Sequence, residues 1–121
     1  MNALGKTDVG LRRHENQDTF AVERLGAQTV AVVCDGMGGA EGGQIASALA
    51  VETFMSELRA LLREDITVEQ LRELASFCVA KANTAVYQRS LEDEDCHGMG
   101  TTLVSAVAGE RGTVVCNVGD S

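Results

Sequence analysis

The sequence lacks a long apolar run, an excess of basic residues and closely spaced cysteines. The apolar run from Val30 to Cys34 is five residues long, whereas a membrane-spanning helix needs ~18, so no membrane partner is expected. The 10 basic residues are outnumbered by 18 acidic ones, and the net charge is −8. Because binding to nucleic-acid phosphates needs clustered Lys and Arg, this balance argues against a nucleic-acid-binding protein. It permits the binding of metal cations.

The four cysteines are widely spaced and form no CxxC motif. Neither a zinc site nor a disulfide framework is therefore predicted. No apolar segment of the kind found in a signal peptide follows Lys6, so a reducing, cytoplasmic compartment is expected. Aromatic residues make up 3% of the chain, which implies a core of Val, Leu, Ile and Ala. Cys34 lies on an apolar strand and is interpreted as part of that core.

Three strands and a glycine-rich segment are predicted in the first third of the chain. The strands cover residues 3–9, 18–25 and 29–34, with a tight connection at residues 26–28. The third strand is almost wholly apolar, which is typical of a strand covered on both faces. Residues 35–43 contain five glycines and are predicted to form a loop.

Two helices and a hairpin are predicted in the remainder. The apolar residues of a helix over residues 45–63 fall on one face. A second helix should begin at Thr67 with a capping box and continue to about Arg89. The acidic residues 92–95 would oppose the dipole at its C-terminus, so they are placed outside it. Strands over residues 101–108 and 113–118 are separated by a connection of hairpin length.

The element order βββααββ predicts an α+β fold with helices packed on a mainly antiparallel sheet. The 121 residues suit one domain or a piece of one. The last predicted strand ends just before Ser121, and nothing covers its edge, which would be an aggregation liability. We therefore expect the domain to be truncated after Ser121.

Residues 35–39 (DGMGG) are the strongest local feature. An apolar strand delivers the carboxylate of Asp35 to its end, where glycines let backbone oxygens approach a ligand. Hard divalent cations such as Mg²⁺ and Mn²⁺ take oxygen ligands of this kind. A plain Asp-Gly turn before a helix is an alternative, and so is a nucleotide-phosphate loop at the helix N-terminus. However, the Lys-Ser/Thr pair of a P-loop is absent.

Three further segments carry candidate residues. Residues 13–18 (RHENQD) offer a guanidinium that could pair with phosphate and a carboxylate five residues later, although a polar surface loop would have the same composition. Residues 119–121 (GDS) again place a carboxylate after a strand. Residues 98–102 (GMGTT) open a strand, and a close backbone crossing explains them at least as well as a direct part in catalysis.

Together the four segments resemble the metal-dependent protein phosphatase family, also called protein phosphatase 2C, and most closely its compact bacterial serine/threonine phosphatases. The family patterns are Arg-x-x-Asn-Glu/Gln-Asp at residues 13–18, Asp-Gly-x-Gly-Gly at 35–39, Gly-Thr-Thr at 100–102 and Gly-Asp-Ser at 119–121. The resemblance extends over essentially the whole chain. It implies a four-layer α-β-β-α sandwich of two antiparallel sheets flanked by helices, here only its N-terminal half.

The resemblance also implies a function. The complete enzyme would hydrolyse phosphoserine and phosphothreonine in proteins with a water activated at a two-metal centre, using two or three Mn²⁺ or Mg²⁺ ions. Its partners would be phosphorylated proteins, including a serine/threonine kinase, and the full-length protein would be a monomer. No nucleic-acid or membrane partner is implied.

Individual roles are carried over from the family patterns. Asp35 would bridge two metal ions, and the carbonyl oxygen of Gly36 would complete the shell of one of them. Asp18 would hold a metal ion or a metal-bound water, and Asp120 would contribute to a third metal site. Arg13 would bind the substrate phosphate.

Two departures from the family matter. Met37 stands where eukaryotic relatives often carry a His that is a proposed general acid. The family's later metal-binding aspartates belong to a segment after Ser121, so residues 1–121 alone are expected to be poorly stable and nearly inactive. A non-catalytic metal- or phosphopeptide-binding module and a nucleotide-binding protein remain the alternative functions.

Overall fold

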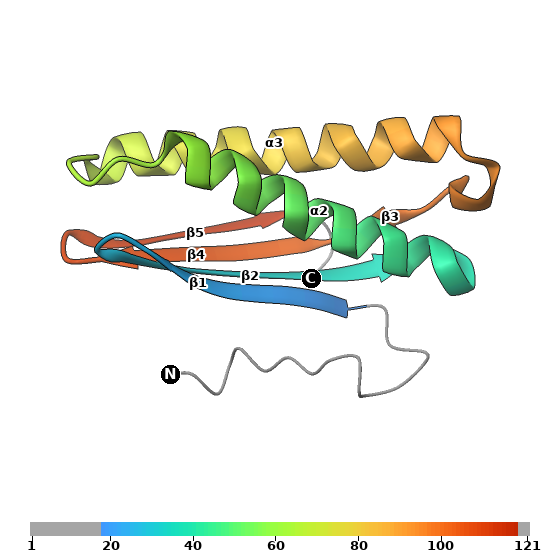
Figure 1. The fold of residues 1–121 in the computed structure, drawn as a ribbon, viewed down its shortest axis with the longest axis horizontal. Helices are drawn as coiled ribbons and strands as arrows, with labels where there is room; N and C mark the ends of the chain where they lie inside the picture. Colours follow the sequence, from blue (N-terminus) through green and yellow to red (C-terminus); the bar gives the residue numbers. More distant parts are fainter. Residues whose placement is uncertain (1–17, 119–121) are drawn as a thin grey trace.

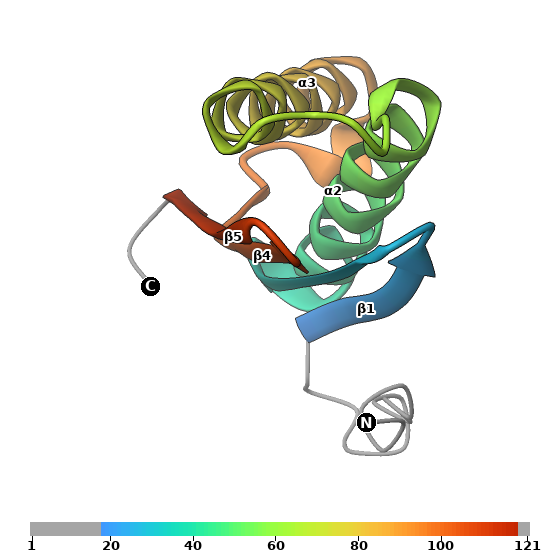
Figure 2. The same cartoon turned by 90° about the vertical axis from the view of Figure 1, so that its left-hand side faces the viewer.

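Residues 18–118, which the computed structural model describes, form an antiparallel sheet with two long helices on one of its faces (Figure 1 and Figure 2). The predicted strand over residues 3–9 lies outside this range. The elements, in chain order, are β1 (Asp18–Leu25), β2 (Gln28–Met37), α2 (Gly39–Leu61), α3 (Val68–Glu92), η2 (Glu94–Cys96), β3 (Gly100–Thr101), β4 (Leu103–Gly109) and β5 (Gly112–Val118).

The sheet has the strand order β1-β2-β4-β5, and the short β3 pairs with the end of β2. All the described pairings are antiparallel, as predicted. Side chains alternate along β2, so that Val30, Val32 and Cys34 are fully buried beneath the helices. Val33 lies on the opposite face and is 45% exposed. The prediction that this strand is covered on both faces was wrong for the described residues, because both helices cover the same face.

Two tight hairpins fix the pairing of the strands. Leu25 pairs with Gln28 across the first turn, and Gly109 pairs with Gly112 across the second. Gly112 has a φ angle of +142°, which glycine adopts more readily than other residues. Both predicted connections are confirmed.

The second helix begins with the predicted capping box. The N–H of Gln70 donates to Oγ1 of Thr67 at 3.0 Å, and the N–H of Thr67 donates to Oε1 of Gln70 at 3.1 Å. The helix continues past Arg89 to Glu92, and Asp93 forms its C-cap, so most of the acidic run lies outside it. Within residues 18–118, neither helix is apolar enough over a sufficient length to cross a membrane.

The glycine-rich segment, which was predicted to be a loop, is instead the end of β2 and the start of α2. A Cβ atom at Gly36 would overlap the carbonyl oxygen of Gly43. Gly38 turns the chain with a φ angle of +121°, and a Cβ atom there would lie 2.6 Å from Cα of Met99. The glycines therefore allow the strand end, the helix start and the segment before β3 to pack against one another. As a result, α2 begins at Gly39, well before the predicted start at residue 45.

The core lies between the sheet and the helices, where Phe54 and Leu58 of α2 are the largest side chains with no exposed surface. Most of the other buried residues are Val, Leu, Ala, Met and Cys, as the low aromatic content predicts. Burial of α2 against both β1 and β2 sets where these strands lie, and thus where Asp18 and Asp35 meet.

Removal of the buried aromatic ring tests this assignment of the core. Phe54→Ala should lower the free energy of unfolding by about 3–5 kcal/mol, because it removes a large buried side chain and leaves a cavity. Phe77→Ala is a matched control, since Phe77 is 45% exposed, and it should cost less than ~1 kcal/mol. Urea unfolding of both variants measures the difference. Equal losses would contradict the proposed core.

Candidate metal centre

The two predicted metal ligands in the described range, Asp18 and Asp35, lie directly opposite each other on neighbouring strands. Opposed residues of an antiparallel pair project to the same face of the sheet. Thr19, the neighbour of Asp18, contacts α2 through Ser47, so Asp18 and Asp35 project from the face away from the helices. Asp35 is exposed and Asp18 is half-buried. The structure thus brings together two carboxylates that are 17 positions apart in sequence.

The hydrogen bonds of Asp35 indicate how close this pair is. Both backbone groups of Asp35 bond to Thr102, on the side away from β1. The Asp18–Asp35 pair is therefore of the non-hydrogen-bonded type, in which Cα atoms are only about 4.5 Å apart and side chains approach closely. Two negative charges directly opposite each other are unfavourable. A divalent cation between them would turn this repulsion into attraction.

Strand β1 is fastened to α2 at two points, which fixes the position of Asp18. Oγ1 of Thr19 and Oγ of Ser47 are hydrogen-bonded at 2.7 Å. Farther along, Nε of Arg59 lies 3.1 Å from Oε2 of Glu23. The side chains of Thr19 and Glu23 both face the helices. Because side chains alternate along a strand, Asp18 is directed to the other face.

The Gly-Thr-Thr segment holds the backbone of Asp35 from the opposite side. The N–H of Asp35 donates to Oγ1 of Thr102 at 3.2 Å, and the N–H of Thr102 donates to the carbonyl oxygen of Asp35 at 3.1 Å. The single hydroxyl hydrogen of Thr101 is shared between the carbonyl oxygen of Thr102, at 2.8 Å, and that of Asp35, at 3.2 Å. The segment therefore pairs with the end of β2, and its close backbone approach is that of Met99 to Gly38. The motif was visible in the sequence, but its contact with Asp35 was not, because the two lie 67 residues apart.

The backbone of Gly36 adds a third potential oxygen ligand. Successive residues of a strand direct their backbone groups to opposite neighbours. Since Asp35 bonds toward Thr102, the carbonyl of Gly36 is directed toward β1, where Asp18 lies. Carboxylate and carbonyl oxygens are the ligands that Mg²⁺ and Mn²⁺ prefer, so this donor set fits a hard cation. Within residues 18–118, no group of three or more His, Cys, Asp or Glu side chains forms a metal site.

The other predicted site residues, Arg13 and Asp120, lie outside the described residues. The register pairs Val118, the last residue of β5, with Leu103 at the start of β4. Thus β1 begins, β2 ends and β5 ends at the same end of the sheet, the end at which α2 starts (Figure 1). Met37 follows Asp35 and Gly36 at this end and is 49% exposed.

The cysteine beside the site is unsuited to nucleophilic chemistry. Cys34 is fully buried, and burial raises the pKa of its thiol to about 12, although a hydrogen bond with Thr101 acts in the opposite direction. The thiol is therefore protonated near neutral pH, and only a thiolate is an effective nucleophile. The interpretation of Cys34 as a core residue is confirmed.

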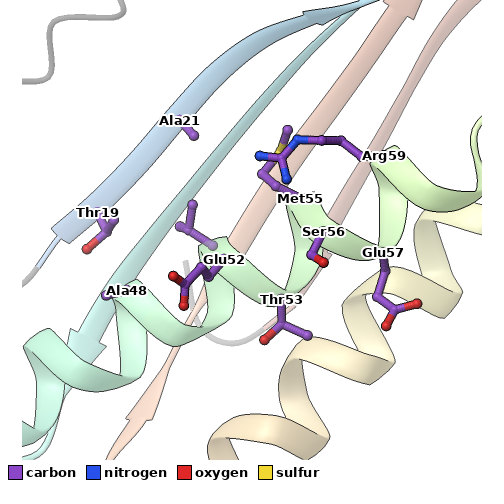
Figure 3. Close-up of a pocket in the computed structure, with 10 residues that line it drawn as sticks. Thr19, Ala21, Ala48, Glu52, Thr53, Met55, Ser56, Glu57 and Arg59 are labelled. Carbon is purple, nitrogen blue, oxygen red and sulfur yellow. The ribbon is translucent and has the colours of Figure 1, made fainter.

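A hollow lies on the other face of the sheet. A cavity of about 710 Å³ separates β1 from α2, with Thr19 and Ala21 on one wall and Glu52, Ser56 and Arg59 on the other (Figure 3). Neither Asp18 nor Asp35 lines it. The candidate metal centre and this cavity are therefore separate features of the molecule.

Comparison with known proteins identifies the family of the chain. The family model described as protein phosphatase 2C matches residues 12–121. The serine/threonine phosphatase stp of Listeria monocytogenes is 37% identical over 125 residues, which cover 100% of this chain and 48% of the relative. The chain thus spans about half the length of the curated relatives that it matches.

Solved structures give the same result. A mutant form of a bacterial serine phosphatase matches with a TM-score of 0.78 and 31% identity, over 90% of this chain and 49% of that one. Stp1 from Staphylococcus aureus matches with a TM-score of 0.72 and 32% identity, over 90% of this chain and 42% of that one. The described sheet and helices correspond to the N-terminal portion of this phosphatase fold. The chain belongs to the protein phosphatase 2C family.

Proposed function

We propose that residues 1–121 form the N-terminal portion of a single phosphatase catalytic domain, and that the complete domain hydrolyses phosphoserine and phosphothreonine in proteins. The observation that carries this proposal is the cross-strand pair of Asp18 and Asp35, in a chain of this family, with an exposed carboxylate on Asp35. The relatives that match are about twice as long as this chain. We expect the 121 residues alone to be nearly inactive.

The exposed sheet face supports the idea that a further layer belongs to the domain. Val33 and Val115 project from the face away from the helices and are 45% and 64% exposed. Burial of such apolar surface is favourable, and a second sheet packed on this face would complete the four-layer sandwich. The same sheet could bring further carboxylates to the end where Asp18 and Asp35 lie.

The protein phosphatase 2C family is metal-dependent, and we propose Mn²⁺ or Mg²⁺, as two or three ions, for this protein. Asp18, Asp35 and the carbonyl oxygen of Gly36 would hold the ions, with Asp120 at a third position. When bound, the ions would supply positive charge to the phosphoryl oxygens and lower the pKa of a bound water. Arg13 would orient the substrate phosphate through its planar guanidinium.

The side chains of the site favour direct attack by water over a covalent enzyme intermediate. Cys34, the nearest thiol in sequence to Asp35, is buried and protonated. The carboxylate of Asp35 is assigned to metal binding in this proposal, and the backbone of Asp35 is held by hydrogen bonds to Thr102. The chain's own part in the reaction is therefore to bind and orient, with Met37 in the place of the His found in eukaryotic relatives.

The proposed substrates are phosphorylated proteins in a cytoplasmic signalling system, including a serine/threonine kinase. The printed names of the relatives, such as serine/threonine phosphatase stp, support this class of substrate. The net charge of −8 disfavours binding to nucleic acids. We propose that the full-length protein acts as a monomer.

Hydrolysis of a phosphothreonine peptide by the complete protein tests the proposed function. Phosphate release should require added Mn²⁺ or Mg²⁺ and should stop in excess chelator, because the two carboxylates bind substrate only through a cation. Phosphate release can be followed with a colorimetric assay. Full activity in chelator would contradict the proposal, whereas peptide binding without phosphate release would favour the non-catalytic module.

Asp35→Asn separates the metal-binding role from a structural one. Activity should fall more than roughly 100-fold, since even the loss of groups that support a metal ligand costs about 10–100-fold. Without metal, the variant should be as stable as the wild type or more stable by about 0.2–1 kcal/mol, because a like-charge pair is removed. Glu110→Gln, at the hairpin turn between β4 and β5, is the control and should change neither property. A rate equal to that of the wild type would exclude Asp35 as a metal bridge.

Arg13→Ala tests the phosphate-binding role. A charged hydrogen bond contributes about 1.5–3 kcal/mol, so the KM for the phosphopeptide should rise roughly 10-fold or more, while Mn²⁺ affinity stays the same. Steady-state kinetics and calorimetric titration with Mn²⁺ measure the two quantities. Arg111→Ala, at an exposed hairpin position, is the matched control. Lost Mn²⁺ binding with an unchanged KM would contradict the assignment.

A further inference from the structure

We infer that the side-chain hydroxyl of Thr102 positions Asp35 for metal binding, as a positioning residue that does not itself touch metal or substrate. The inference rests on the proposed function, since it assigns a supporting residue to the proposed metal centre. It is carried by an unusual exchange of hydrogen bonds between β2 and the chain at Thr102.

The exchange departs from a regular antiparallel ladder. In a regular hydrogen-bonded pair, each residue donates its N–H to the backbone carbonyl of the other. Thr102 does donate to the carbonyl oxygen of Asp35, at 3.1 Å. The N–H of Asp35, however, donates to the Oγ1 atom of Thr102 at 3.2 Å. The carbonyl oxygen of Thr102 instead accepts a hydrogen bond from Oγ1 of Thr101, at 2.8 Å.

The hydroxyl of Thr102 has thus replaced a backbone carbonyl as the hydrogen-bond acceptor for the N–H of Asp35, the residue that carries the proposed bridging carboxylate. Thr102 is 8% exposed, so its hydroxyl is held in a packed environment, whereas the carboxylate of Asp35 faces solvent. The backbone of Asp35 is therefore fixed while its side chain is free to take a ligand. The direction of the Cα–Cβ bond follows from the backbone. By holding the N–H of Asp35, the Thr102 hydroxyl therefore orients the side chain that carries the carboxylate.

Thr102 holds both backbone groups of the same residue. Its Oγ1 atom accepts from the N–H of Asp35, and its own N–H donates to the carbonyl oxygen of Asp35. On the other side, β1 presents Asp18 as the direct partner of Asp35. A rotation of the Asp35 peptide would move the carboxylate relative to that of Asp18. Loss of the Thr102 hydroxyl should therefore weaken a site that both carboxylates must share.

The test uses the complete protein with four substitutions. Thr102→Val keeps the shape of the side chain and removes the hydroxyl, and Thr102→Ala does so without any risk of overpacking. Thr102→Ser keeps the hydroxyl and should restore binding. Ser105→Ala is the matched control, because Ser105 lies three residues later, on β4, and its buried hydroxyl has no hydrogen-bond partner among the described residues. Calorimetric titration with Mn²⁺ gives the metal affinity, and NMR gives the hydrogen-exchange rate of the Asp35 amide.

Thr102→Val and Thr102→Ala should weaken Mn²⁺ binding by roughly 10- to 100-fold, the range found for groups that orient metal ligands. The Asp35 amide should exchange faster in both, and the KM for phosphopeptide at saturating Mn²⁺ should stay the same. Thr102→Ser and Ser105→Ala should match the wild type within about 3-fold in Mn²⁺ affinity.

Three results would overturn the inference in distinguishable ways. If the wild type binds Mn²⁺ and folded Thr102→Val or Thr102→Ala binds it equally well, the hydroxyl has no positioning role and the proposed function stands. If the wild-type protein binds no Mn²⁺, the proposed function fails and this inference fails with it. An equal loss of affinity in Ser105→Ala would show that any change in the packing of β4 weakens the site, which also overturns the specific role of Thr102.

Discussion

The register between β1 and β2 is the constraint on which the rest of the site depends. It places Asp18 opposite Asp35, and a slip by one residue would send one of the two carboxylates to the helix-covered face. Such a slip is energetically unfavourable because buried and exposed side chains alternate along β2. Val30, Val32 and Cys34 would leave the core, while Val33 and Asp35 would enter it. The apolar pattern of β2 therefore secures the geometry of the proposed metal ligands.

The packing of glycines against the backbone supplies the second constraint. The end of β2 can approach the start of α2 because Gly36 has no side chain to collide with Gly43, and the segment before β3 approaches Gly38 for the same reason. This approach brings Thr101 and Thr102 to the backbone of Asp35. Two motifs that are separate in sequence thus come together, and Asp35 lies between the partner strand β1 and a pair of threonine hydroxyls.

Features encoded by local chemistry could be predicted from the sequence. The strand Asp18–Leu25 and the capping box at Thr67 depend on nearby residues, and both occur as expected. The loop predicted over residues 35–43 was wrong because glycine permits many conformations, and tertiary packing selects among them. The role of Thr102 could not be predicted either, since it consists of a hydrogen bond across 67 residues. The resemblance implied a metal-binding role for both Asp18 and Asp35, whereas their closeness follows from the pairing of β1 with β2.

The complete domain that we propose would account for two unfavourable features, the opposed carboxylates of Asp18 and Asp35 and the exposed valines on the same face of the sheet. Two opposed carboxylates cost stability on their own, and valines at the surface of the same sheet face gain nothing from exposure to water. A cation would relieve the first cost, and a second sheet would relieve the second. If that sheet also carries the remaining metal ligands, metal binding and burial of the apolar face become coupled. The isolated half would then lack both stabilising contributions for the same reason, which is why binding energy and folding energy should rise together when the domain is complete.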